Sequence, residues 1–445
     1  MVRNNQKNSL FPQLVTLIIA LLFFTPLRAL TIIIIPFLYL YWKVVFNLKT
    51  NISGVIVSGL YLFSCCIGVI NHTIPVANAI LSCWIVIPIF FLMFSKVKRC
   101  VSIFQFRFFL MVMQRILVVI DILGFIARFL IFRTEDEFGF AYGQHFQYVS
   151  GLAMMNAPFF LYHFITVINK AGSKANIYYM LFFLLSFLCC FFGLGLICLS
   201  LTLFLYLISY KNLKGVYYVI LVGGIVMGIL VVSNKDVIDY NMQNVSKLIE
   251  GQEDDYINAR KVLVFINYVD FVESNPLLAF SGVGGGGFNG RVSFLLNKES
   301  DNIFTKVLGH HMPIFHSKYA YPLWNKEVAS FDNHTDGTRN KPFSSLLSIA
   351  SEGGIILFLF FLFLWGKQIK YCYIYFRHDY LFQFLFCLNI LWFFSLLSEV
   401  WLESSEFIFY LLLNMVTIAY LNTKMRWHES FIKKQEKDKL ISSVR

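Results

Sequence analysis

The residues best placed to do chemistry lie in one polar insertion, roughly residues 234–343, of an otherwise apolar chain. It contains the one run of four glycines, Gly284–Gly287. A polar turn with His334 and Arg339 lies directly before the next apolar stretch. The glycine run is either a flexible turn or a place where backbone closely approaches a substrate phosphate or sugar. If the protein does chemistry, we expect it in this insertion, against one face of a bilayer.

Metal and nucleotide chemistry find little support in the same insertion. His310, His311 and His316 have no carboxylate three or four residues further on and no cysteine nearby, so no metal site is predicted. The insertion has no Asp-x-Asp pair. The glycine run lacks the Gly-Lys-Ser/Thr ending of a phosphate-binding P-loop and has no strand–turn–helix setting. We therefore expect no metal and no cofactor.

A second polar pattern lies within the fifth apolar stretch. Arg107, Gln114, Asp121 and Arg128 are spaced by seven, so each is displaced by only about 20° from the last around a helix. Charges in the middle of a membrane are costly and normally face partners or a wet cavity. The row is either a seam of paired charges or, at Arg128, part of a cavity for an anionic lipid head. In the second case Asp121 pairs with Arg115 or Arg128.

The elements that must position these residues are membrane helices. The chain is 58% hydrophobic and 14% charged, whereas soluble domains are about a quarter charged. Because a span needs about 20 apolar residues, we predict an all-α integral membrane protein with about 12 transmembrane helices. One large outer loop of short helices separates spans 9 and 10. The predicted spans are about 10–25, 29–46, 53–71, 76–94, 108–132, 151–168, 177–192, 194–210, 216–233, 346–366, 380–398 and 405–421.

The orientation follows from lysine and arginine in the short loops. Nearly all of them fall on one side of the predicted membrane, while the opposite short loops hold only Arg28 and Arg133. Such an excess marks the cytoplasmic side, so the net charge of +12 is a topology signal and not a nucleic-acid footprint. We expect both termini in the cytoplasm and the loop outside. The predicted regions are spans 1–9 (1–233), the outer loop (234–343), spans 10–12 (344–422) and a basic cytoplasmic tail (423–445).

Two motifs, together with this topology, carry a resemblance to a known family. The first runs from Arg260 through Asn275-Pro276-Leu277 to Gly282-Val283-Gly284-Gly285, and the second is Leu346-Leu347-Ser348-Ile349-Ala350-Ser351-Glu352-Gly353-Gly354-Ile355. They resemble the Arg…Pro-Leu…Gly-x-Gly and Leu…Glu-x-Gly-Ile patterns of the O-antigen polymerase and O-antigen ligase superfamily. Members of that superfamily usually have His-Asn shortly before the second motif. Here Arg339-Asn340 stands nearest that place, with His334 a few residues earlier.

The resemblance implies transfer of a glycan from an undecaprenyl pyrophosphate carrier to a sugar hydroxyl, in a multi-span protein of the bacterial inner membrane. Such a reaction needs cations for the departing pyrophosphate and a base for the incoming hydroxyl. The resemblance makes Arg260 and His334 the candidate catalytic residues, with His334 as the base or the residue that positions the acceptor. The candidate contacts to the pyrophosphate or glycan are Arg128, Arg291, Arg339, Gly284 and Gly285.

The partners implied are the carrier-linked oligosaccharide, membrane lipid and a chain-length regulator protein, with no nucleic acid. Within the superfamily we favour a polymerase, which extends a carrier-linked repeat unit, because the His-Asn signature is altered. The alternatives are a ligase, which transfers glycan to lipid A-core, and more remotely a transporter or flippase. The chain shows no paired repeats with broken helices of the kind many transporters have.

Overall fold

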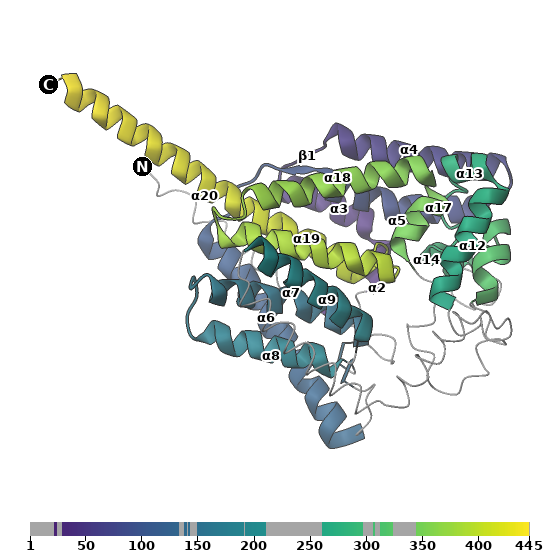
Figure 1. The fold of residues 1–445 in the computed structure, drawn as a ribbon, viewed down its shortest axis with the longest axis horizontal. Coiled ribbons are helices and arrows are strands. Elements are labelled where there is room, and N and C mark those ends of the chain that lie inside the picture. Colours follow the sequence, from purple (N-terminus) through teal and green to yellow (C-terminus); the bar gives the residue numbers. More distant parts are fainter. Residues whose placement is uncertain are drawn as a thin grey trace.

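The structure, a computed structural model, describes residues 22–24, 29–132, 138–139, 141–142, 149–190, 192–210, 260–296, 306–307, 312–323 and 344–444. Within these ranges the side chains of 29, 132, 260–262 and 427–444 are not described. The described part of the chain is mostly helical (81%). Figure 1 shows long helices stacked side by side, with the short helices α12, α13 and α14 at one end.

The first half of the described chain supplies a series of helices and one small sheet. The helices are α2 (Ala29–Ile33), α3 (Ile35–Val45), α4 (Ile52–Ile70), α5 (Val76–Phe94), α6 (Ile103–Ile126) with the π-helix η3 (Ala127–Phe132), α7 (Val149–Ile168), α8 (Ala175–Cys189) and α9 (Gly193–Ser209). The strands β1 (Leu48–Lys49) and β2 (Lys96–Val97) pair antiparallel, with Leu48 opposite Val97.

The second half begins in the polar insertion and ends in the membrane bundle. The helices are α12 (Arg260–Ser274), α13 (Pro276–Ser281), α14 (Arg291–Leu295), η7 (His316–Ala320), η8 (Tyr321–Leu323), α17 (Ser345–Glu352), α18 (Gly354–Ile374), α19 (Tyr380–Ser398) and α20 (Ser405–Val444). Helix α20 therefore continues from the last predicted span into the basic tail.

Seven of the described helices are long and apolar enough to cross a membrane, which confirms the prediction of a helical, membrane-embedded protein. They are Ile52–Ile70, Val76–Phe94, Ile103–Ile131, Val149–Ile168, Gly354–Ile374, Tyr380–Ser398 and Ser405–Arg426. Three shorter apolar helices, Ile35–Val45, Ala175–Cys189 and Gly193–Ser209, match other predicted spans. The predicted spans at 216–233 and, except for 22–24, at 10–25 lie outside the described residues. A total of about twelve stays a prediction.

Helix α19 forms the centre of the bundle. In α19, 78% of the membrane-length window is buried, against 28% in α18. It packs against α7, α9, α17, α18 and α20, and Figure 1 shows it between α18 and the α7–α9 layer. A helix that is apolar all round is one surrounded by protein or lipid, and α19 has protein on most sides.

The tenth predicted span, at about 346–366, is wrong in its boundaries. The structure breaks this stretch at Gly353, so that α17 ends at Glu352 and the membrane-length helix starts at Gly354. Gly354 has a φ of +85°, and a Cβ there would lie 2.3 Å from the Phe280 carbonyl oxygen. Only glycine tolerates both this left-handed backbone and the close approach of the Phe280 carbonyl group of α13. All eight residues of α17 are buried, although four of them are polar.

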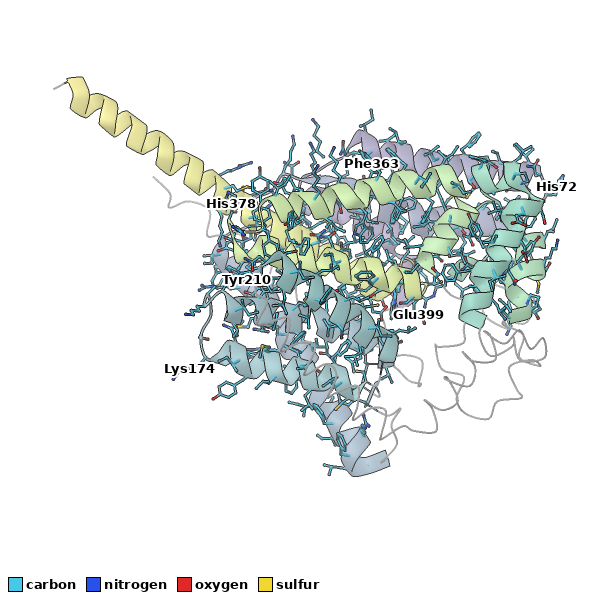
Figure 2. The ribbon with its side chains drawn as sticks, in the orientation of Figure 1. His72, Lys174, Tyr210, Phe363, His378 and Glu399 are labelled. Atoms are coloured by element: carbon cyan, nitrogen blue, oxygen red, sulfur yellow. The ribbon has the colours of Figure 1, made fainter. Side chains whose placement is uncertain are left out.

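Basic loops and the glycine run lie at opposite ends of the bundle. At one end β1 pairs with β2, Asn422 Nδ2 donates to the Val97 carbonyl, and Lys424 forms an ion pair of 2.6 Å with Asp379. At the other end of α4, Thr73 Oγ1 donates to the Val283 carbonyl at 3.0 Å. Figure 2 shows Lys174, Tyr210 and His378 at the first end and His72 at the second.

Candidate functional site

The best-organised polar site among the described residues is the buried carboxylate of Glu352, the last residue of α17. Its Oε1 accepts hydrogen bonds from Gly290 N (2.7 Å), Phe288 N (3.2 Å) and Ser293 Oγ (3.3 Å). Its Oε2 accepts one from Gly286 N (2.8 Å). We call residues 282–293, which enclose this group, the cradle. The glycine-run motif and the Glu-x-Gly motif therefore meet in one structure.

The cradle is held by backbone contacts on the other side as well. Val283 N donates to the Ser351 carbonyl and Gly284 N to the Glu352 carbonyl, both at 3.0 Å. Ser64 Oγ of α4 also donates to the Glu352 carbonyl. The glycine run is therefore buried and hydrogen-bonded. Its backbone closely approaches a carboxylate of the same chain, and an approach to a substrate phosphate or sugar stays a prediction.

Helices α4 and α5 form hydrogen bonds with the cradle. Gly285 N donates to Cys65 Sγ at 3.2 Å, and Asn78 Nδ2 donates to the Gly286 carbonyl at 3.0 Å. Gly286 has a φ of +70°, a conformation that favours glycine. The helical hairpin of α4 and α5, early in the chain, thus positions a loop of the polar insertion, which comes much later in the chain.

A second buried carboxyl group, Glu403, lies beside Glu352. It belongs to the connection between α19 and α20 and accepts hydrogen bonds from the backbone N–H groups of Val292 and Arg291. Burial and then the charge of Glu352 raise the pKa of Glu403 to about 8, and Arg291 opposes the rise. Its Oε2 is buried without a hydrogen-bond partner. Near neutral pH Glu403 therefore carries a proton, because burial disfavours its charged form and the neighbouring Glu352 adds to that effect.

Glu352 itself is subject to opposing influences. Burial raises the pKa of Glu352, whereas the N–H groups of Gly286, Gly290 and Phe288 and the hydroxyl of Ser293 favour its ionised form. The three N–H groups can only donate, so they match a carboxylate and cannot match an amide or a hydrocarbon equally well.

His316, at the start of η7, forms a hydrogen bond with the cradle. Its Nδ1 lies 2.6 Å from the Phe288 carbonyl oxygen, and because a carbonyl only accepts, Nδ1 carries the proton. Burial lowers the pKa of His316 to about 4, so its ring is neutral at pH 7. Its Nε2 is buried without a hydrogen-bond partner. His310 and His311, its companions in the histidine cluster, lie outside the described residues, and no metal-binding group of three or more ligands occurs among the described ones.

The structure brings three of the predicted site residues together. Gly284 and Gly285 form the cradle floor, with their N–H groups donating to Glu352 and Cys65 as above. The half-buried Arg291 begins α14 at the cradle's end, and its Nη1 donates to the Glu403 carbonyl at 2.8 Å. A substrate-binding role for these three residues stays a prediction.

Of the remaining predicted site residues, only Arg128 has a described side chain. Arg260 begins α12, but its side chain is not described. His334 and Arg339 lie outside the described residues. Arg128 is in η3, where its Nη1 donates to the Cys189 carbonyl at 2.5 Å and its guanidinium lies 5.2 Å from the Phe129 ring centroid. Arg128 is thereby tied to the end of α8.

The predicted pairing of Asp121 with Arg115 or Arg128 is wrong. Asp121 Oδ1 accepts a hydrogen bond from Asn156 Nδ2 of α7 at 3.1 Å, and Asp121 forms no ion pair with either of these arginines. Arg115 is exposed. Gln114 instead bonds His163 Nε2 of α7 at 2.9 Å. The row spaced by seven is a polar seam between helices, but of hydrogen bonds and not of paired charges.

Glu352, Glu403 and His316 were not predicted as site residues. A signal was present for Glu352, because it is the one acidic residue of the second motif and interrupts an apolar run. In the sequence Glu403 is an ordinary acidic residue of a short loop, and His316 is one of several histidines of the insertion. No local pattern distinguishes a buried loop carboxyl from a solvated one.

No protein-family model matches this chain, and no curated protein matches it. The resemblance to the O-antigen polymerase and ligase superfamily therefore rests on the topology and the two motifs.

Proposed function

We propose that the chain is an inner-membrane glycosyltransferase of repeat-unit polysaccharide assembly, an O-antigen polymerase. It would transfer glycan from an undecaprenyl pyrophosphate donor to a sugar hydroxyl of a carrier-linked repeat unit. The observation that carries the proposal is the cradle, in which the two motifs behind the resemblance are joined through Glu352. The cradle lies at the end of the bundle opposite the basic loops, where the charge pattern places the outer face.

The cradle supplies a rigid platform and leaves the chemistry to groups around it. Arg291, half-exposed at the cradle's end, is placed to meet a pyrophosphate at the membrane surface, with Arg260 and Arg339 as further cations. Bidentate arginine contacts stabilise the charge that develops on the leaving pyrophosphate. In the reaction the acceptor oxygen bonds to the anomeric carbon, the bond from that carbon to the pyrophosphate oxygen breaks, and the hydroxyl proton passes to a base, for which His334 is the candidate.

Deletion of the gene followed by glycan analysis tests the proposal. A lost polymerase leaves lipid A-core capped with single repeat units. Complete loss of capping, with polymer accumulating on the carrier, would instead identify a ligase. An unchanged polysaccharide ladder would overturn both.

Complementation then tests the assigned cations. We expect Arg260→Ala and Arg291→Ala to abolish long-chain glycan at an unchanged protein level. Lys261→Ala, which removes the positive charge next to Arg260, is the matched control and should restore the ladder. Equal ladders for all three variants would contradict the arginine assignments.

A further inference from the structure

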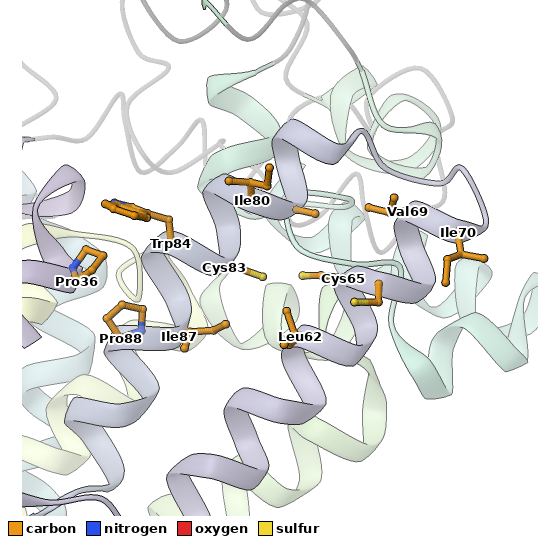
Figure 3. A pocket seen from close by; sticks show the side chains of 12 residues that line it. Pro36, Leu62, Cys65, Val69, Ile70, Ile80, Cys83, Trp84, Ile87 and Pro88 are labelled. Atoms are coloured by element: carbon orange, nitrogen blue, oxygen red, sulfur yellow. The ribbon is translucent and has the colours of Figure 1, made fainter.

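An apolar groove of about 640 Å³ lies between α3, α4 and α5. Figure 3 shows its lining side chains, among them Pro36, Leu62, Ile80 and Pro88. None of the lining residues is charged, and the only heteroatoms that their side chains offer are the thiols of three cysteines and the Trp84 indole nitrogen. That nitrogen is already engaged, because it donates to the Ile33 carbonyl at 2.7 Å. The groove is therefore built for hydrocarbon.

The groove faces the lipid region. Leu62, Ile70 and Ile80 are 49%, 72% and 64% exposed, which is the condition of side chains that meet lipid tails in a membrane helix. Two prolines help to shape the gap: Pro88 lies inside α5 and Pro36 in the first turn of α3. A proline in a helix interior removes a backbone hydrogen bond and disturbs the adjacent turn.

One end of the groove lies against the cradle. Its α4 residues fall between 62 and 70, about 12 Å along the helix axis, in the half of α4 that ends near Thr73. Cys65, which lines the groove, accepts the hydrogen bond from Gly285 N of the cradle. Gly285 itself is buried, so a hydrocarbon chain in the groove would end beside the cradle.

We propose that this groove holds the isoprenoid chain of the carrier lipid, in the part of the chain next to the pyrophosphate. The inference rests on the proposed function, which supplies a polyprenyl pyrophosphate as the donor. Lipid tails are as apolar as the groove, so burial alone gives no preference within a membrane, and selectivity must come from packing. A shaped, proline-bordered groove gives a methyl-branched chain surfaces to pack against that a smooth helix face lacks.

Photo-crosslinking tests the groove directly. The full-length protein in phosphatidylglycerol–phosphatidylethanolamine nanodiscs would receive polyprenyl pyrophosphate with a diazirine on the isoprene unit nearest the pyrophosphate. We expect crosslinks within residues 62–70 and 79–88. Ile80→Trp, which fills the groove, should reduce them about tenfold, a modest change in binding free energy. Ile122→Trp on α6, where Ile122 is also lipid-exposed at 45%, should leave them unchanged.

The outcomes separate the groove from the proposed function. Crosslinks spread over all lipid-facing helices, or equal loss with Ile122→Trp, would overturn the groove. Competition by a straight-chain phospholipid as effective as that by unlabelled polyprenyl pyrophosphate would also overturn it. Groove crosslinks in a protein whose deletion leaves the glycan ladder intact would support the groove and overturn the polymerase. A changed ladder without groove crosslinks would do the reverse.

Discussion

Two buried carboxyl groups of this protein, Glu352 and Asp121, differ in how the surrounding chain treats them. Glu352 receives three backbone N–H groups and one hydroxyl, all from the cradle. Asp121 accepts a hydrogen bond from one side chain, Asn156, and its Oδ2 is buried without a partner. Both are fully enclosed by protein. Glu352 is therefore the carboxyl group on which the surrounding backbone depends more.

The contrast follows from the kind of donor. Backbone N–H groups cannot rotate away, so a loop that directs three of them to one point is stable only with an acceptor there. The cradle and Glu352 therefore depend on each other. Asn156 is a side chain that can turn its amide, and α6 and α7 keep their internal hydrogen bonds whatever occupies position 121. The intramembrane polar row is an accessory to helix packing, whereas Glu352 organises the proposed site.

Removing the Glu352 side chain should have the largest effect. Glu352→Ala leaves three buried N–H groups without acceptors and opens a cavity, so we expect a loss of at least about 3 kcal/mol of stability. Polymer synthesis should disappear with it. Thermal unfolding in detergent, compared with the wild type, measures the change. A loss below about 1 kcal/mol would remove the basis of the comparison.

A matched exchange of carboxylate for amide sharpens the comparison. Glu352→Gln turns an –NH₂ group towards N–H donors and should cost about 2 kcal/mol or more. Asp121→Asn makes the same chemical change where one donor can reorient, and it should cost less than about 1 kcal/mol. Both variants are measured in the same unfolding assay. Equal costs would mean that donor number does not distinguish the two sites.

His316 tests how far the dependence on Glu352 extends into the insertion. His316→Phe keeps an aromatic ring at this position but removes the hydrogen bond to the Phe288 carbonyl. We therefore expect a loss of about 1 kcal/mol of stability. Because the folded pKa of about 4 lies below the ordinary value of 6.5, the unfolded chain binds the proton first. The wild type should therefore lose stability as pH falls from 6.5 towards 4, and the variant should lose less over that window. An unchanged acid slope would contradict a buried neutral histidine.

Glu403 should give the smallest effect in mild acid and an effect that grows as the pH rises. Its folded pKa of about 8 lies above the ordinary 4.5, so its contribution is complete below 4.5 and is lost as pH rises through 8. Glu403→Gln mimics the protonated form and cannot lose a proton, so it should change stability by less than about 1 kcal/mol near pH 5 and gain on the wild type as the pH rises towards 8. The free energy of unfolding is measured between pH 5 and 9 for both proteins. It should vary less with pH in the variant than in the wild type. Identical profiles would place the ionised form at Glu403.

The sequence was sufficient for some parts of the site and not for others. The motif around Gly284 and the motif around Glu352 were both recognisable, because glycine runs and an acidic residue in an apolar stretch stand out locally. Their contact was not, since more than sixty positions separate them. The pairing of Asp121 with an arginine failed because spacing by seven defines a helix face but does not say which neighbouring helix covers it. Gly353 and Gly354 were visible too, yet only the approach of Phe280 shows that the helix must break there.

By itself the amino-acid sequence determined the membrane-embedded helical character of this protein and the separation of its basic loops from its polar insertion. Both depend on the transfer of each segment between water and lipid, which is a property of local composition. The tertiary structure decided that the glycine run encloses Glu352, that Glu403 shares its surroundings, and that α19 lies at the centre of the bundle. These depend on which surfaces meet after the helices pack, where a one-residue break or a single buried donor changes the outcome.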